Sequence, residues 1–137
     1  MSYAISAALQ AAVFTALSGD VTLAGLIGTA IYDAPPVVVD STYILLGEDE
    51  AKDRSSGSHK GVTLDFEVNV ISDIAGFSTA KTVAAAICDV LIDADLPLSR
   101  GALVNLKFLK SRARRGASPE QRRIALVFRA ILDDGSY

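Results

Sequence analysis

The side chains that most often do chemistry in proteins are sparse in this chain. His59 is its only histidine and Cys88 its only cysteine. His59 lies in a polar Ser/Gly segment, where a solvated loop residue is the ordinary interpretation and a general base or metal ligand the alternative. Cys88 lies beside the apolar stripe of an expected helix, so we interpret it as a small buried hydrophobe rather than a nucleophile. We therefore expect no catalytic residues and no cofactor.

An acidic cluster lies in one short segment and consists of Glu48, Asp49, Glu50 and Asp53. Alternate residues of a strand share a face, so Glu48 and Glu50 could together hold a hard cation. The spacing lacks the glycine-turned Asp-x-Asp loop of a calcium site, and the chain has no P-loop and no GxGxxG motif. A solvated strand, or a salt-bridging surface for another subunit, fits these residues better than a metal site.

Positive charge is concentrated near the end of the chain. Seven of the 13 Lys and Arg residues lie between positions 107 and 123, with Glu120 as the only acid among them. They are Lys107, Lys110, Arg112, Arg114, Arg115, Arg122 and Arg123. On two adjacent strands these residues would form a projecting basic hairpin. It could be a solvated tip that prevents aggregation, a contact for an acidic protein surface, or a contact for nucleic acid.

The composition is typical of one globular domain over residues 1–137. Hydrophobic residues make up 50% of the chain and charged residues 21%, and the formal net charge is −3. The net charge gives the whole chain no electrostatic attraction to nucleic acid. No basic region typical of a signal peptide is present at the N-terminus, and no apolar run approaches the ~18 residues that cross a membrane. We expect a soluble protein without membrane contact.

The clearest element is a strand over residues 61–73. Apolar residues such as Leu64, Phe66 and Val68 alternate with polar residues such as Asp65. This period of two predicts a half-buried strand, with its apolar side toward a core and its polar side toward water or a partner.

Three helices are expected from apolar stripes of helical period. The expected ranges are 2–17, 21–27 and 78–94. Gly19 is expected to end the first helix in the left-handed conformation, and Asp20 to cap the second. Ser78 or Thr79 is expected to cap the third.

Four further strands are expected. Their ranges are 30–33 with a continuation over 37–40, 42 onward through the acidic cluster, 102–115 and 120–133. Pro35 and Pro36 limit the first of these to an edge or an extended connection. Residues 52–60 contain no apolar side chain and are expected to form a mobile loop inside a long hairpin.

The last two strands are expected to form a second long hairpin that turns at 116–119. Val104, Leu106 and Phe108 should share the apolar face of its first strand, and Lys110 and Arg112 should follow on that same face. In its second strand one set of positions alternates with another: Ile124, Leu126, Phe128, Ala130 and Leu132 alternate with Ala125, Val127, Arg129 and Ile131. The resulting order, α-α-β-β-β-α-β-β, predicts an α+β fold. We expect a mixed, mainly antiparallel sheet of long hairpin strands with helices packed on one face.

Several segments together resemble a known family. They are AALQAAVFTALSGD (7–20), IYDAPP (31–36), TYILLGEDE (42–50), VTLDFEVNV (62–70), AGFSTAKTVAAAICDVL (75–91) and RIALVFRAIL (123–132). The pattern is similar to the tail terminator, or tail-completion, proteins of long-tailed phages and of phage-derived gene transfer agents. The resemblance spans nearly the whole chain, and its most specific parts are 31–36 and 43–48.

The resemblance implies a structural virion protein and no enzyme. Proteins of this type form a hexameric ring on the last ring of the tail tube and stop tube polymerisation. They present the surface to which the head–tail connector or stopper protein binds, and DNA passes through the ring without sequence-specific binding. The implied location is the head–tail junction of a virion or virus-like particle, after assembly in the bacterial cytoplasm.

A ring needs a heterologous contact, in which one patch meets a different patch on the next copy. The acidic segment 48–53 and the basic hairpin 107–123 are complementary candidates. Some of the arginines could instead face the lumen and touch the DNA backbone. The loop 52–60 is expected to become ordered on docking to the tube or connector. Its charged docking candidates are Lys52, Arg54, His59 and Lys60.

Other functions stay open at this point. A tail-tube or head–tail connector protein would share the ring architecture, but a tube protein would polymerise by itself. A nucleic-acid-binding accessory protein would use the basic hairpin. A small enzyme or ligand-binding domain would need a polar cleft that contains His59 or the acidic cluster.

Overall fold

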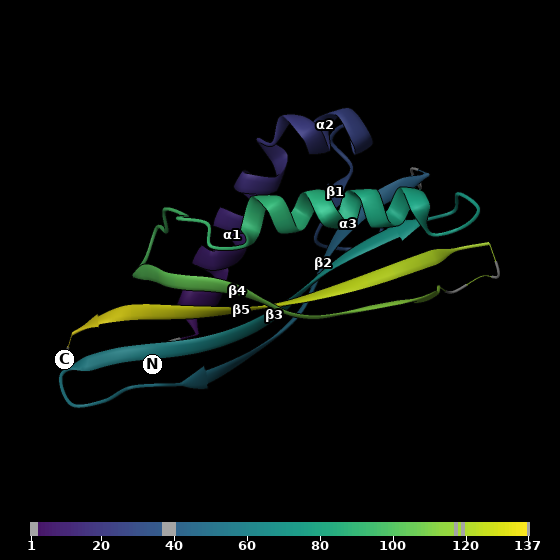
Figure 1. Cartoon of the computed structure of the whole chain (residues 1–137). Coiled ribbons are helices and arrows are strands. Elements are labelled where there is room, and N and C mark those ends of the chain that lie inside the picture. The colour runs from purple at the N-terminus through teal and green to yellow at the C-terminus, as the bar shows by residue number, and fades with distance from the viewer. Residues whose placement is uncertain (1–2, 37–40, 117, 119, 137) are drawn as a thin grey trace.

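The computed structural model describes residues 3–36, 41–116, 118 and 120–136. They form a five-stranded sheet with three helices on one face (Figure 1). The elements are α1 (Ala4–Ser18), α2 (Val21–Ile27), β1 (Ile31–Tyr32), β2 (Thr42–Asp53), β3 (His59–Ser72), α3 (Ser78–Leu91), β4 (Ala102–Arg115) and β5 (Arg122–Ser136). The predicted α+β class and the predicted order of elements are confirmed.

The sheet has the strand order β1-β2-β3-β5-β4. β1 is parallel to β2, and the other neighbours are antiparallel. Consequently β4 is one edge of the sheet. At the other edge, β1 covers β2 only at two positions, where Ile31 pairs with Ile44 and Tyr32 with Leu45. The rest of β2 has no described strand on its outer side.

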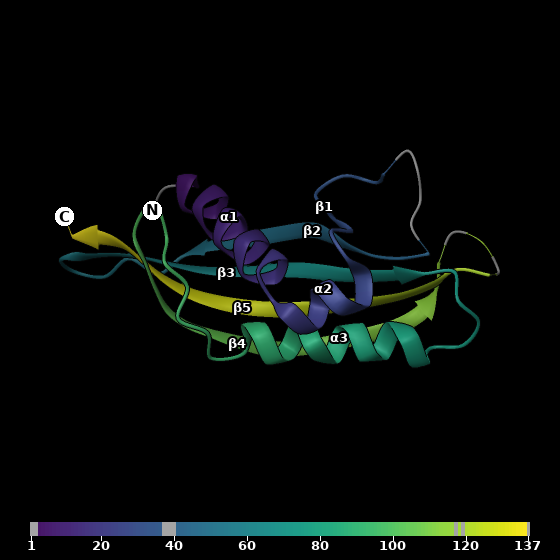
Figure 2. The ribbon, with the colours of Figure 1, turned by 90° about the horizontal axis from the view of Figure 1, so that it is seen from above.

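The core lies between the sheet and the helices. On β3 the side chains of Leu64, Phe66 and Val68 are buried, and on β5 Phe128 is buried beside Phe66 with ring centroids 5.7 Å apart. The alternation predicted for these two strands is confirmed. Seen from above, α3 runs along the β4 side of the sheet and α1 crosses near β2 (Figure 2). The opposite face of the sheet carries none of the described helices and is called the open face below.

Two β-bulges change the faces of β4. Val104 is an extra residue between the pairs Leu103–Leu132 and Asn105–Ile131, and Leu109 is an extra residue between the pairs at Phe108 and Lys110. An extra residue moves every following side chain to the other face. The prediction that Val104 shares the face of Leu106 is therefore wrong, since Leu106 is buried and Val104 is 63% exposed.

The second bulge also overturns the prediction for the basic residues of β4. Phe108 pairs with buried Phe128, but Lys110 pairs with Val127, which points to the open face. Lys110 and Arg112 therefore lie on the open face and not on the face of Leu106. Arg114 follows them there because it pairs with Arg123.

A third bulge lies in β2, where two residues, Gly47 and Glu48, face Glu67 alone on β3. A Cβ atom on Gly47 would lie 2.6 Å from Asn69 Nδ2 and 3.1 Å from Glu67 Cβ. A side chain at position 47 would force Asn69 and Glu67 to shift, so glycine favours the bulge here.

The helix ends follow the predictions in part. Asp20 caps α2 as predicted, and its Oδ2 accepts a hydrogen bond of 3.0 Å from the Leu23 N–H. Gly19 has φ −86°, so the left-handed end predicted there is wrong. α3 begins after Phe77 without a side-chain cap, because Ser78 is already helical, and it ends at Leu91 rather than near position 94.

The predicted loop 52–60 is shorter than expected. β2 continues to Asp53 and β3 begins at His59, so Lys52, His59 and Lys60 are strand residues. Backbone bonds between Ser56 and His59, and from Arg54 N–H to Gly61 O at 2.8 Å, close the turn. The predicted continuation over 37–40 and two residues of the predicted turn 116–119 lie outside the described residues.

No single helix in the described residues is both long and apolar enough to cross a membrane. α1 and α2, bent by 77° at their junction, reach that length and apolarity only together.

Candidate assembly surface

The described residues contain no group of three or more His, Cys, Asp and Glu side chains placed to hold a metal ion. His59 is exposed, and its Nδ1 lies 3.9 Å from Asp133 Oδ2. Cys88 is partly buried, and this burial raises the pKa of its thiol. A raised pKa keeps the thiol protonated and unreactive at neutral pH.

The acidic cluster separates into residues with different partners. Asp49 turns toward α1, where its Oδ1 accepts a hydrogen bond from Tyr3 Oη at 2.8 Å and its Oδ2 accepts one from Ser6 Oγ at 2.5 Å. Asp53 accepts hydrogen bonds from the N–H and Oγ of Ser55, and these bonds lower its pKa. Asp49 therefore ties the first helix to the sheet.

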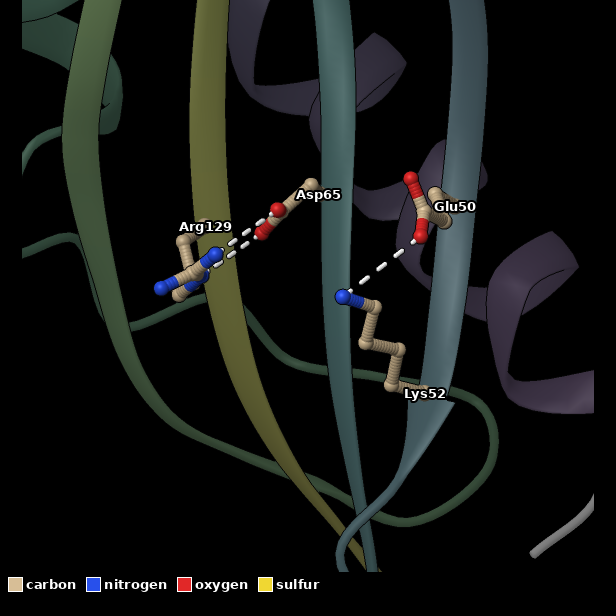
Figure 3. A network of polar contacts seen from close by, with 4 residues as sticks. All are labelled: Glu50, Lys52, Asp65 and Arg129. Carbon is tan, nitrogen blue, oxygen red and sulfur yellow. Dashed lines mark hydrogen bonds and ion pairs between the residues drawn. The ribbon is translucent and has the colours of Figure 1, made fainter.

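The other two acids of the cluster remain exposed on β2. Glu50 lies 3.6 Å from Lys52, and both side chains are 70% exposed, so this ion pair contributes little to stability (Figure 3). Glu48 makes no hydrogen bond or ion pair within the described part of the chain. These two carboxylates are available to a partner.

An ion pair that the sequence analysis missed lies on the open face. Arg129 of β5 donates two hydrogen bonds, of 2.8 and 2.9 Å, to the two carboxylate oxygens of Asp65 on β3 (Figure 3). These donors hold the pKa of Asp65 below its ordinary value. Both residues lie at predicted outward positions of their strands, but the pairing depends on β3 and β5 being neighbours.

The basic hairpin also separates into two groups. Lys107 Nζ lies 2.7 Å from Asp93 Oδ1. Arg123 Nε donates to Asn69 Oδ1 at 3.3 Å, and the guanidinium of Arg122 lies over the ring of Phe77. These three cations have partners inside the chain.

The other four cations are Lys110, Arg112, Arg114 and Arg115, and all are exposed on the outer half of β4. None of them makes a hydrogen bond or an ion pair with another described residue. Lys110 acts only at longer range, where its charge helps to lower the pKa of Asp65. Of the predicted basic hairpin, only these four cations on the edge strand β4 lack a partner in the described chain, and they are called the basic row below.

A trough of about 560 Å³ crosses the open face from β2 to β4. Its charged lining includes Glu48, Glu50, Asp65 and Glu67 on the β2–β3 side, and Arg129 and Lys110 on the β5–β4 side. The open face is thus acidic toward one edge of the sheet and basic toward the other. Such a surface can join charged proteins.

Comparison with family models and comparison with solved structures both find matches. The model of the family described as "Tail completion protein gp17" matches residues 11–133. A chain in the solved structure titled "Virion of native gene transfer agent (GTA) particle" is 51% identical, with a TM-score of 0.91. The match covers 96% of this chain and 99% of that chain. No protein with a curated description matches this chain in sequence.

Proposed function

Because the chain belongs to the tail completion protein gp17 family, we propose that it closes the end of a tail tube as a ring. The family assignment makes the chain a structural protein of a virion tail. In the proposed role, six copies sit on the last ring of the tube at the head–tail junction and stop its polymerisation. They also present the surface to which the head connector or stopper binds, and DNA passes through the ring without sequence-specific contacts.

The observation that carries this proposal is the similarity to a chain of a gene transfer agent particle over almost the full length of both chains. With 51% identity and a TM-score of 0.91, the two chains share one fold over almost their full length. A similarity of this extent supports a common place in a tail, whereas a shared fold alone would not.

The charge distribution supports assembly into a ring. A ring requires two different patches that meet between neighbouring copies. The chain offers the acids Glu48 and Glu50 at the β2 edge of the sheet and a basic row at the β4 edge. We propose these residues as interface residues. The turn between β2 and β3, with Arg54, is proposed to dock on the tube or the connector.

The proposal is tested by polymerising the purified tube protein of the same particle with and without this chain. We expect added chain to arrest tube growth at a molar ratio of a few copies per tube end, and electron microscopy should show short, capped tubes. Incorporation of the chain along the tube would identify a tube protein instead. Tubes of unchanged length with no bound chain would contradict the proposal.

A further inference from the structure

The outer half of β4 is an open edge of the sheet. From Lys107 onward, no described strand pairs with the free side of β4. Leu109 is 41% exposed there, and Lys110, Arg112 and Arg114 line the open face without a hydrogen-bonding partner in the described chain. A long strand edge with unpaired backbone groups is a template for another strand.

A second open edge lies on the other side of the same sheet. β1 covers β2 only at Ile44 and Leu45, so the part of β2 beyond Leu46 has no described strand on its outer side. This part carries Glu48 and Glu50, which line the same trough of the open face as Lys110. The two edges therefore carry opposite charges on the same face.

The β2 edge is also flanked by a groove. Ala7, Ala11 and Phe14 of α1 line it on one side, and Ile31 and Tyr32 of β1 line it on the other. Phe14 is 44% exposed although it belongs to a helix that packs on the sheet. The groove reaches β2 at Leu46, next to the part of β2 that has no described strand on its outer side.

From these features we infer that the outer half of β4 in one copy pairs antiparallel with β2 of the next copy, so that the sheet continues from subunit to subunit. In this pairing Arg112 lies opposite Glu50 and Arg114 lies opposite Glu48. The inference rests on the proposed ring and names the contact that builds it.

The position of β1 selects this register. Within one chain, the paired positions traced across the sheet from β2 to β4 align Glu50 with Lys107. They also align Arg112 with Leu45, which already pairs with Tyr32 of β1. A neighbour aligned without an offset would collide with β1. An offset of four residues, about 13 Å along the strand, removes the collision.

In the offset register the pairing ends with Arg115 opposite Gly47, just before β1. Arg112 and Arg114 then face acids across the new pair of strands, where directly opposite charges attract. Lys110 lies opposite Lys52 and diagonal to Glu50, which makes this the one like-charged pair of the contact.

Charge argues against two other uses of the basic row. Pairing of two β4 edges with each other would bring arginines together, and like charges across strands are destabilising. A DNA phosphate would approach Arg112 and Arg114 beside Glu67, because all three line one trough on the open face. This acid repels a phosphate and a carboxylate alike, but an added β2 strand also forms a ladder of backbone hydrogen bonds with the edge of β4, which a DNA backbone cannot form.

The inference is tested by charge reversal and charge exchange, with ring formation on tail tubes measured by native mass spectrometry and electron microscopy. Arg112→Glu/Arg114→Glu, and separately Glu48→Arg/Glu50→Arg, should each lower the fraction of chain in rings at least about tenfold. The chain that carries all four substitutions should form rings again. Asp89→Lys/Asp95→Lys, which reverses two exposed acids that belong to neither β2 nor β4, is the matched control and should assemble normally.

The outcomes separate this inference from the proposed function. If the wild-type chain forms rings and both reversal variants form them equally well, the strand pairing is overturned and the proposed ring is left intact. A wild-type chain that never forms rings would overturn both. Reversal variants that form rings but lose affinity for DNA would assign the arginines to phosphate and contradict the pairing. Loss of rings without restoration in the exchanged chain would also contradict it.

A cross-linking experiment tests the register directly. In a Cys88→Ala background, a Glu50→Cys chain is mixed with an Arg112→Cys chain on tail tubes and oxidised. The register predicts covalent dimers between the two chains. The control mixture of Glu50→Cys with Ala102→Cys separates the thiols by eight paired positions, about 26 Å along the strand, and should stay uncross-linked. Equal cross-linking in both mixtures would overturn the register.

Discussion

The two halves of β4 belong to one strand and have different surroundings. In the inner half, Leu106 is fully buried against β5 and the helices, and Lys107 is held by Asp93. In the outer half, Lys110, Arg112 and Arg114 are exposed and make no ion pair within the described chain. The bulge at Leu109 separates the halves, because it exchanges the faces of the strand.

This difference separates residues that stabilise the subunit from residues available for assembly. A charge held by a part-buried hydrogen bond inside the chain, as Asp49 is by Ser6, contributes to the fold, and changing it should lower stability. A charge without such a partner contributes little to the fold, and changing it should alter only assembly. The same division holds on β2, where Asp49 is tied to α1 and its neighbour Glu48 is free.

The largest expected effect lies in the inner half of β4. Leu106→Ala should lower the free energy of unfolding by about 2–5 kcal/mol, because it removes a fully buried side chain and leaves a cavity. Val104→Ala on the same strand should change it by less than about 0.5 kcal/mol, since Val104 is 63% exposed. Urea unfolding measures both. Equal losses would show that the bulge at Val104 is placed wrongly.

A smaller effect is expected at the neighbouring acids of β2. Asp49→Ala should lower the free energy of unfolding by about 1–3 kcal/mol, because Tyr3 and Ser6 lose their charged acceptor. Glu48→Ala should change it by less than about 0.5 kcal/mol. Urea unfolding of the isolated subunit measures both changes, and an equal loss of free energy of unfolding in the two variants would contradict this difference.

The Asp65–Arg129 pair should give a still smaller, pH-dependent effect. The pKa of Asp65 is lowered in the folded chain, so its stabilising effect is present above the ordinary carboxyl pKa of about 3.9 and is lost as pH falls through the lower folded value. Asp65→Asn should lower Tm by no more than about 4 °C near pH 6. Thermal unfolding should show this difference shrinking below about pH 4. A difference that grows as the pH falls would contradict the assigned pair.

The smallest effect on stability is expected in the outer half of β4. Arg112→Ala/Arg114→Ala should leave Tm unchanged within about 2 °C, because neither side chain has a partner in the described chain. The same variant should assemble poorly on tail tubes. Calorimetry together with electron microscopy of the tubes checks both statements, and a large fall in Tm would place these arginines in the fold.

Much of the fold could be predicted because it is local. The alternation of β3 and β5 and the Asp20 cap of α2 follow from residue types at short spacing, and the structure has both. The bulges of β4 could not be predicted, since one extra residue leaves no mark in the composition of a strand. The bulge of β2 had a signal in Gly47, because glycine inside a strand marks such sites.

The charged surface was predicted as two whole segments, and the structure divides each of them. Asp49 and Lys107 have partners that lie far away in the sequence, Tyr3 with Ser6 and Asp93. Asp65 and Arg129 are 64 residues apart in sequence and meet only because β3 lies beside β5. The order of the strands in the sheet decides which charges lack a partner. This order cannot be predicted from residue patterns at short spacing.

The most direct test of the proposed ring is native mass spectrometry of the wild-type chain, alone and after addition of tail tubes from its own particle. The proposal predicts one closed species of six copies, formed either in solution or only at tube ends. A ladder of open-ended polymers, or a chain whose mass is unaffected by tubes, would contradict it.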